Sequence, residues 1–196
     1  MDTERIFKFL LVVCCFINAF PVKDGLVRGK KDHDLLKIAM GLTVAADLLM
    51  VILNINIFGI LIFCAVQAVH NYRFTNLARV KVQAIVGAVV FAGAFLLSGF
   101  NLIFSAGCAY AIFTIYSLTG AFMAWNKYPA PNNTLVVVGM VLFLLCDIFV
   151  MINSLPILEM YGEKTLEIVN KGIWLCYLPA QVMLSSSARV ILVEEK

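Results

Sequence analysis

Charged residues are scarce in this chain of 196 residues: they make up 14% of it, whereas about 25% is usual for a soluble domain. Hydrophobic residues account for 62%, and the mean hydropathy is +0.95. This balance excludes an ordinary soluble globular domain and indicates an integral membrane protein. The net charge is only +3, and the scattered basic residues are not interleaved with aromatic ones. The composition therefore gives no support for nucleic-acid binding.

Cysteine and histidine form no metal-binding or redox pattern. The six cysteines lie in apolar runs without a C-x-x-C pair, so we interpret them as small packing residues. The two histidines, His33 and His70, are far apart in sequence, and His33 falls in a polar loop. We therefore expect neither a metal site nor a cofactor.

Long apolar runs make up most of the sequence. They are much longer than the roughly 9–11 residues of a membrane-spanning strand, so spanning α-helices are expected. We interpret residues 1–196 as a single all-α domain, a polytopic transmembrane helical bundle. About seven spans are predicted, at residues 6–22, 35–53, 57–74, 82–97, 101–125, 134–153 and 172–192. The first is expected to be a retained helix because no A-x-A cleavage site follows it. Residues 126–133 contain two prolines and are predicted to be a loop.

Basic residues predict the orientation of these spans. If the N-terminus lies outside, most lysines and arginines fall in inside loops, and the outside keeps only Arg5, Lys8, Lys164 and Lys171. Because cytoplasmic loops are enriched in basic residues, we predict an N-out, C-in arrangement. The expected location is the inner (plasma) membrane of a prokaryote, or the endoplasmic reticulum of a eukaryote.

Two aspartates stand inside apolar runs. Asp47 and Asp147 are each followed by four apolar residues and then isoleucine. A charge at membrane depth costs at least about 2.5–3.5 kcal/mol, so such a residue usually has a partner or a function. In the predicted topology both lie roughly 18–20 Å from the inner face, at 1.5 Å of rise per residue.

Other polar residues are predicted to reach a similar depth. Gln67 and Tyr177 lie on spans that run the opposite way, and Gln181 shares a helix face with Tyr177. His70 is one turn deeper than Gln67 on the same face. We therefore predict a buried polar cluster around the two aspartates.

The order of these motifs resembles the YhhN family of membrane proteins, whose characterised members are lysoplasmalogenases. That family has a Gly-Asp in an early helix, a helix with H-x-x-Y, a helix with G-x-x-x-F-x-x-S-D, and a last helix with tyrosine and a polar residue. The corresponding positions here are Ala46-Asp47, Gln67-Ala68-Val69-His70, Gly139 to Asp147, and Tyr177 to Gln181. Ala46, Gln67 and Cys146 depart from the family pattern. The family usually has eight helices, so one near the N-terminus is expected to be missing.

The resemblance implies hydrolysis of the vinyl ether bond of a 1-alkenyl lysophospholipid, giving a fatty aldehyde and a glycerophospho-headgroup. Such a reaction starts with protonation of the double bond and passes through an oxocarbenium-like cation. Two carboxylates suit it, because in a low-dielectric site one is expected to keep its proton while the other activates water. We assign Asp47 and Asp147 to this pair without apportioning the roles. Gln67, His70, Tyr177 and Gln181 would orient water or the headgroup.

Two alternatives remain open from the sequence. The aspartates could carry protons in a small transporter or proton relay, although no clear inverted repeat is present. The chain could also be a non-catalytic lipid-binding or structural membrane protein, in which each aspartate bonds a neighbouring helix. Ser185-Ser186-Ser187 has no G-x-S-x-G context and is interpreted as a helix-packing segment.

Overall fold

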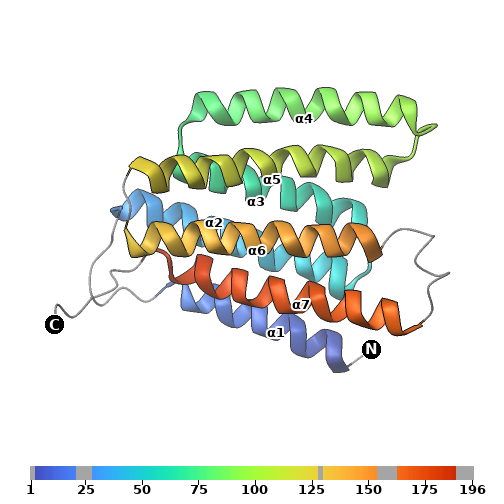
Figure 1. The fold of residues 1–196 in the computed structure, drawn as a ribbon, viewed down its shortest axis with the longest axis horizontal. Coiled ribbons are helices and arrows are strands. Elements are labelled where there is room, and N and C mark those ends of the chain that lie inside the picture. The colour runs from blue at the N-terminus through green and yellow to red at the C-terminus, as the bar shows by residue number, and fades with distance from the viewer. Residues whose placement is uncertain (1–2, 21–27, 128–129, 154–162, 189–196) are drawn as a thin grey trace.

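The computed structural model describes residues 3–20, 28–127, 130–153 and 163–188, and all regular structure within these ranges is helical. Seven α-helices and one π-helical turn follow each other along the chain. They are α1 (Thr3–Asn18), α2 (Lys30–Asp47), η1 (Leu48–Ile52), α3 (Asn56–Phe74), α4 (Leu77–Leu97), α5 (Leu102–Lys127), α6 (Pro131–Asn153) and α7 (Glu163–Ser186). Figure 1 shows them as a bundle of roughly parallel rods. The prediction of an all-α fold is confirmed.

Five of these helices are long and apolar enough to cross a membrane: α2 together with η1, α3, α4, α5 and α6. The predicted multi-pass membrane protein is therefore supported. Helix α1 is shorter, at 16 residues. Helix α7 is long, but its first half carries the charged residues Glu163, Lys164, Glu167 and Lys171. The N-out orientation stays a prediction.

Several predicted boundaries were wrong. Helix α2 begins at Lys30 rather than at residue 35, and α7 begins at Glu163 rather than at residue 172. Pro131 was assigned to a loop but is the first residue of α6. Proline is well tolerated there, because its fixed φ suits a helix and the first-turn N–H has no intrahelical partner. Residues 189–192 of the last predicted span lie outside the described residues.

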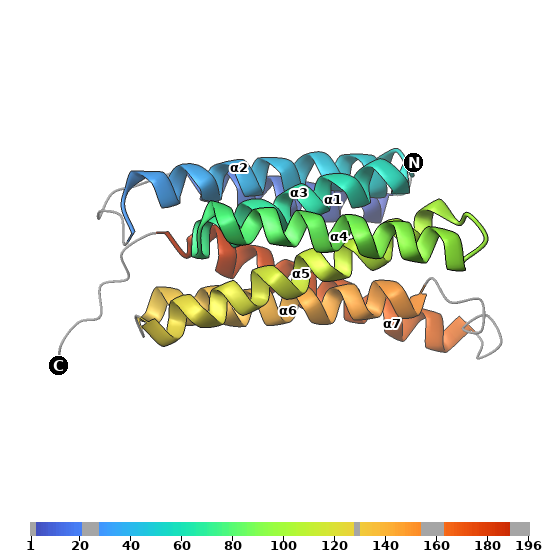
Figure 2. The same ribbon diagram turned by 90° about the horizontal axis from the view of Figure 1, so that it is seen from above.

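Six helices pack around a common interior. Contacts connect α1 to α2, α2 to α3, α3 to α5, α5 to α6, α6 to α7 and α7 back to α1. Viewed from above, α2 and α3 lie on one side of this ring and α6 and α7 on the other (Figure 2). Helices α6 and α7 pack closely, and a Cβ added to Gly139 would lie 3.1 Å from Leu184. The absence of a side chain at Gly139 thus lets the two helices approach.

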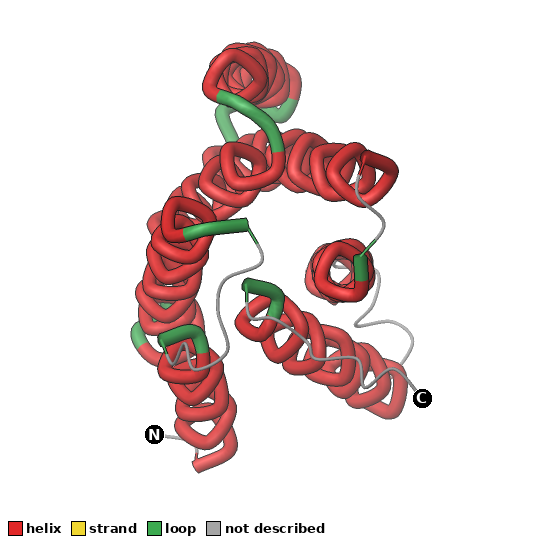
Figure 3. Tube along the Cα trace, turned by 90° about the vertical axis from the view of Figure 1, so that its left-hand side faces the viewer, coloured by secondary structure: helices red, strands yellow, loops and turns green. Residues whose placement is uncertain are grey.

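Helix α4 lies outside the ring, against α5 and α3 (Figures 1 and 3). Only Gln83 and Gly87 of its residues are buried. The Gln83 amide accepts a hydrogen bond from Asn71 of α3 at 2.9 Å and donates one to the Phe113 carbonyl of α5 at 2.9 Å. These bonds fix α4 at a position where its apolar outer face would meet lipid.

The π-helical turn η1 follows directly after Asp47. It ends at Ile52, and Asn54, in the short connection to α3, has a positive φ of 56°. Gly59 of α3 packs against this turn so closely that an added Cβ would lie 2.1 Å from Met50. Such π-turns are frequent at functional sites, and this one places an irregular segment next to a buried carboxylate.

Candidate functional site: two aspartate–tyrosine pairs

Asp47 is the last residue of α2 and is buried, with 4% of its surface exposed. The hydroxyl of Tyr177 on α7 donates a hydrogen bond of 2.6 Å to its carboxylate. This bond crosses the interior from one side of the ring to the other. It connects two residues that the sequence analysis had singled out separately, and it gives the buried carboxylate the polar partner that its position requires.

Asp147 is in the second half of α6 and has a partner of the same kind. The hydroxyl of Tyr110 on α5 donates a hydrogen bond of 2.8 Å to its carboxylate. Asp147 and Tyr110 are only partly buried, in contrast to Asp47 and Tyr177. The second pair is therefore the more accessible one, and it lies between α5 and α6.

An aromatic chain connects the two tyrosines. Tyr110 packs against Phe63 of α3, with ring centroids 6.1 Å apart, and Phe63 packs against Phe143 of α6 at 6.0 Å. Phe143 in turn makes an edge-on contact with Tyr177 at 5.7 Å. Ring contacts of this kind favour defined orientations. The same series of four packed rings therefore helps to fix the positions of both tyrosine hydroxyls.

Cys146 precedes Asp147 on α6, and its side chain is close enough to both Asp47 and Asp147 to interact with them electrostatically. Its side chain is buried, 4% exposed, in the core that also contains Tyr177 and Phe143. Tyr177 and Tyr110 are likewise close enough to interact electrostatically. The two pairs thus belong to one polar site at the centre of an apolar bundle.

Gln67 on α3 and Gln181, one turn from Tyr177 on α7, have side-chain amides without hydrogen-bond partners among the described residues. Both are buried, at 0% and 1% exposed. The Gln67 amide lies near the Tyr110 hydroxyl without completing a hydrogen bond, and Thr114 lies near Tyr110 and Asp147 in the same way. Buried amides without partners are rare, and they mark places where a polar ligand can bind.

His70 occupies a different position from the other predicted site residues. Its ring stacks on Phe74, with centroids 5.8 Å apart and planes 17° apart, one turn along α3 from Gln67. The charged group in electrostatic contact with it is Arg73 rather than either aspartate. His70 therefore lies between the central site and the end of the bundle that carries Arg73.

Tyr110 is the main residue that the sequence analysis missed. A signal was present: Tyr110, Thr114 and Ser117 occur at spacings of four and three on α5 and so share one helix face. Thr114 and Ser117 are buried, and the Ser117 hydroxyl donates to the backbone carbonyl of Gln67. This polar stripe indicates which face of α5 is turned to the interior.

The serines near the chain end make structural contacts. Asn18 of α1 donates to the hydroxyls of Ser185 and Ser186 at 3.1 and 3.2 Å, and Ser187 accepts from Arg73 at 2.9 Å. These bonds agree with the interpretation of this segment as one that packs helices. Within the described ranges, no group of three or more His, Cys, Asp or Glu side chains is arranged so that it could hold a metal ion.

Fold and site together define a class: a multi-pass α-helical membrane protein with a polar site of two carboxylates and two tyrosines enclosed by its helices. The chain belongs to the YhhN family, whose family model matches residues 3–188. Comparison with curated proteins and with solved structures gave no significant match.

Proposed function

We propose that this protein is a membrane-embedded hydrolase that cleaves the vinyl ether bond of lysoplasmalogens. The products would be a fatty aldehyde and a glycerophospho-headgroup. The observation that carries the proposal is the pairing of Asp47 with Tyr177 and of Asp147 with Tyr110 at one site in an apolar bundle. Membership of the YhhN family, in which lysoplasmalogenases occur, supports it.

The reaction needs one proton donor and one activated water. A proton added to the double bond at the carbon remote from oxygen leaves an oxocarbenium-like cation. Water then attacks the carbon that carries oxygen and loses a proton, and the resulting hemiacetal separates into aldehyde and alcohol. Asp47 and Asp147 would supply the acid and the base, as paired carboxylates do in glycoside hydrolysis. The proton given up by the water balances the proton donated in the first step.

Tyr177 and Tyr110 would orient the carboxylates. A carboxyl group has two oxygens, and a hydroxyl donating to one of them leaves the other free to face substrate or water. Gln67 and Gln181, which have buried amide groups without partners, would bind the attacking water or the glycerol oxygens. Each of these groups is held by a helix rather than by a loop, which favours a fixed geometry.

Access for a lipid substrate would be through the partly exposed pair. Asp147 and Tyr110 lie between α5 and α6, so an alkenyl chain could enter there from the surrounding bilayer. The apolar core around Val136, Met140 and Phe143 would then surround the chain. The more deeply buried Asp47 would face the reacting bond from the other side of the ring.

Aldehyde release from purified protein tests the proposal. We expect aldehyde from a 1-alkenyl lysophospholipid and none from the matched 1-alkyl lysophospholipid, because only the vinyl ether has a double bond to protonate. If the protein releases no aldehyde from either choline or ethanolamine lysoplasmalogens, the proposal is refuted. Proton-coupled flux in liposomes would then distinguish a proton relay from a non-catalytic lipid-binding protein.

A further inference from the structure

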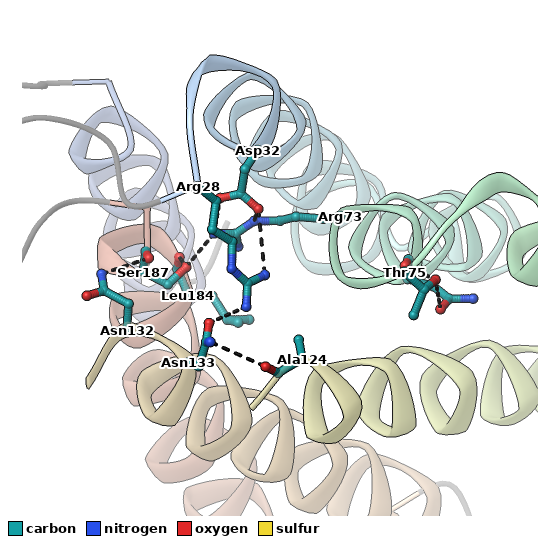
Figure 4. Close-up of polar contacts among 10 residues, drawn as sticks. Arg28, Asp32, Arg73, Thr75, Ala124, Asn132, Asn133, Leu184 and Ser187 are labelled. Atoms are coloured by element: carbon teal, nitrogen blue, oxygen red, sulfur yellow. Dashed lines mark hydrogen bonds and ion pairs between the residues drawn. The ribbon is translucent and has the colours of Figure 1, made fainter. Parts of the chain in front are cut away.

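A second polar cluster lies at one end of the bundle, which we call the basic end because Arg28, Lys31, Arg73, Arg79 and Lys127 lie there. Its centre is the ion pair between Arg73 of α3 and Asp32 of α2 (Figure 4). The guanidinium of Arg73 donates to both carboxylate oxygens of Asp32, at 2.8 and 3.0 Å, and to the Ser187 hydroxyl. The Arg73 side chain is 0% exposed.

Arg28 adds a second positive charge to the same carboxylate. Its guanidinium lies 3.8 Å from Asp32 and donates a hydrogen bond to Asn133 of α6. Both guanidinium groups also lie over the ring of Phe74, at 5.7 Å for Arg28 and 5.4 Å for Arg73. Burial lowers the pKa of the Arg28 guanidinium; Asp32 opposes this effect, and the nearby charge of Arg73 adds to it. Two arginines are thus held close together with one carboxylate between them.

The cluster has an excess of positive charge and an unused donor. Arg28 and Arg73 carry one positive charge each against one negative charge on Asp32, and Nη1 of Arg73 is buried without a hydrogen-bond partner among the described residues. A buried donor on a charged group is costly when it is left unpaired. An anion placed beside Arg73 and Arg28 would balance the charge and accept the free N–H.

A cavity of about 350 Å³ lies beside these side chains. Arg28, Lys31, Asp32, Tyr72 and Arg73 line it, and Lys31 points its ammonium to the Tyr72 hydroxyl at 2.9 Å. The cationic side chains of Arg28 and Lys31 therefore border the space, with the ion pair of Arg73 and Asp32 buried next to Arg28, together with a phenol and the polar turn between α3 and α4. Guanidinium groups match phosphate oxygens in geometry and charge.

We propose that this cavity is an anion site that binds a phosphate group, supplied either by the headgroup of an anionic lipid or by a soluble phosphate compound. Arg28 and Arg73 are its direct ligands, and Lys31 closes its outer rim. The site is separate from the aspartate–tyrosine pairs. Positions 32 and 47 of the continuous helix α2 are 15 residues apart, which corresponds to about 22 Å. A headgroup phosphate is only a few bonds from the vinyl ether, so one substrate molecule cannot occupy both places.

Thermal unfolding of the full-length protein in neutral detergent tests the proposal without any activity assay. The protein would be titrated with inorganic phosphate, with dihexanoyl phosphatidate and with dihexanoyl phosphatidylcholine, each against sodium chloride of matched ionic strength. A ligand that binds only the folded state raises the unfolding temperature. We expect a rise with phosphatidate, with phosphate, or with both, and a smaller one with phosphatidylcholine. A rise with phosphatidate alone identifies a lipid headgroup, and a rise with phosphate identifies a site that also accepts soluble phosphate.

Arg28→Gln is the informative variant, because Arg28 is partly exposed and Asp32 keeps its bonds to Arg73 when Arg28 is lost. Lys37→Gln is the matched control: it removes one positive charge from the same end of the bundle, but Lys37 pairs with Asp34 and does not line the cavity. Loss of a charge-assisted hydrogen bond should weaken phosphate binding at least about tenfold in Arg28→Gln. Lys37→Gln should bind as the parent does. Equal responses of the two variants, an equal rise with phosphatidylcholine, or no rise beyond that of sodium chloride would overturn the proposal.

Discussion

The hydroxyl of Tyr177 donates to the carboxylate of Asp47 over 2.6 Å, and this bond joins α7 to α2 across the interior of the bundle. The bond between Tyr110 and Asp147 repeats the arrangement between α5 and α6. Phe63 and Phe143 pack between the two tyrosines and so connect the two pairs through a continuous series of ring contacts. Substitutions of the tyrosines, as well as of the aspartates, should therefore affect activity.

Replacing Tyr177 by phenylalanine should lower aldehyde release while keeping the fold. The ring and its contacts with Phe143 and Trp174 are retained, but Asp47 loses the donor that orients it. A hydrogen bond to a charged group contributes about 1.5–3 kcal/mol, so a loss of roughly 10- to 100-fold in kcat is expected. Tyr116→Phe is the control, since Tyr116 lies on α5 beside Arg79, away from both aspartates. An equal effect of the two variants on kcat would contradict the assigned role.

Replacing Gln67 or Gln181 by methionine should lower the activity of the protein without lowering its stability. Each side-chain amide is buried without a partner, at a cost of about 1–3 kcal/mol for an unmade hydrogen bond. The methionine variants should therefore unfold at the same or a higher temperature than the parent and should hydrolyse substrate more slowly. Gln83→Met is the matched control: Gln83 is equally buried but bonded to Asn71 and Phe113, so its loss should lower the unfolding temperature. Full activity in Gln67→Met and Gln181→Met would remove them from the site.

Replacing only one partner of the ion pair between Asp32 and Arg73 should lower the stability of the protein strongly, whereas replacing both partners should lower it less. Arg73→Gln leaves a buried carboxylate without its main partner, and breaking a buried pair in this way costs about 3–5 kcal/mol. The double variant Asp32→Asn with Arg73→Gln removes both charges and should recover much of that loss. Chemical or thermal unfolding in detergent measures both. Lys171→Gln, which breaks an exposed pair with Glu167, should leave the unfolding temperature unchanged. A double variant as unstable as Arg73→Gln would show that the charge pair is not the cause.

The orientation predicted from the basic residues can be checked by labelling cysteines in intact cells. Lys127 lies at the basic end of the bundle, and Leu97 lies at the opposite end, where α4 ends. If the basic end faces the cytoplasm, a membrane-impermeant maleimide should label Leu97→Cys and not Lys127→Cys. The parent protein sets the background from its native cysteines. Labelling of Lys127→Cys alone would reverse the predicted orientation.

Helix number and the central carboxylates could be predicted from the sequence because they depend on local patterns. Apolar runs of spanning length predict helices, and a charge within such a run identifies an interior position. Tyr177 and Gln181 were placed correctly on one buried face because positions four apart on a helix lie together. Spacing on a helix was thus enough to predict that these two side chains are both buried.

Pairings between distant residues could not be obtained in this way. The bond between Tyr110 and Asp147 depends on which face of α5 meets α6, and that is decided by the packing of the whole ring. Asp32 and Arg73 are 41 residues apart, and Asp32 precedes His33, which was predicted to lie in a polar loop. The helical start at Pro131 was missed because a proline that begins a helix looks, in sequence, like a proline that ends one.

Aldehyde release by the two aspartate variants shows whether Asp47 and Asp147 are both needed for catalysis. The purified parent, Asp47→Asn, Asp147→Asn and Asp34→Asn would be compared on one 1-alkenyl lysophospholipid at equal amounts of folded protein. Asp34 lies on the same helix as Asp47 but is exposed and paired with Lys37, which makes it the matched control. We expect the parent and Asp34→Asn to release aldehyde, and we expect Asp47→Asn and Asp147→Asn to fold but to lose at least about 100-fold in rate. Parent-like rates in either of the two central variants would contradict the paired-carboxylate site.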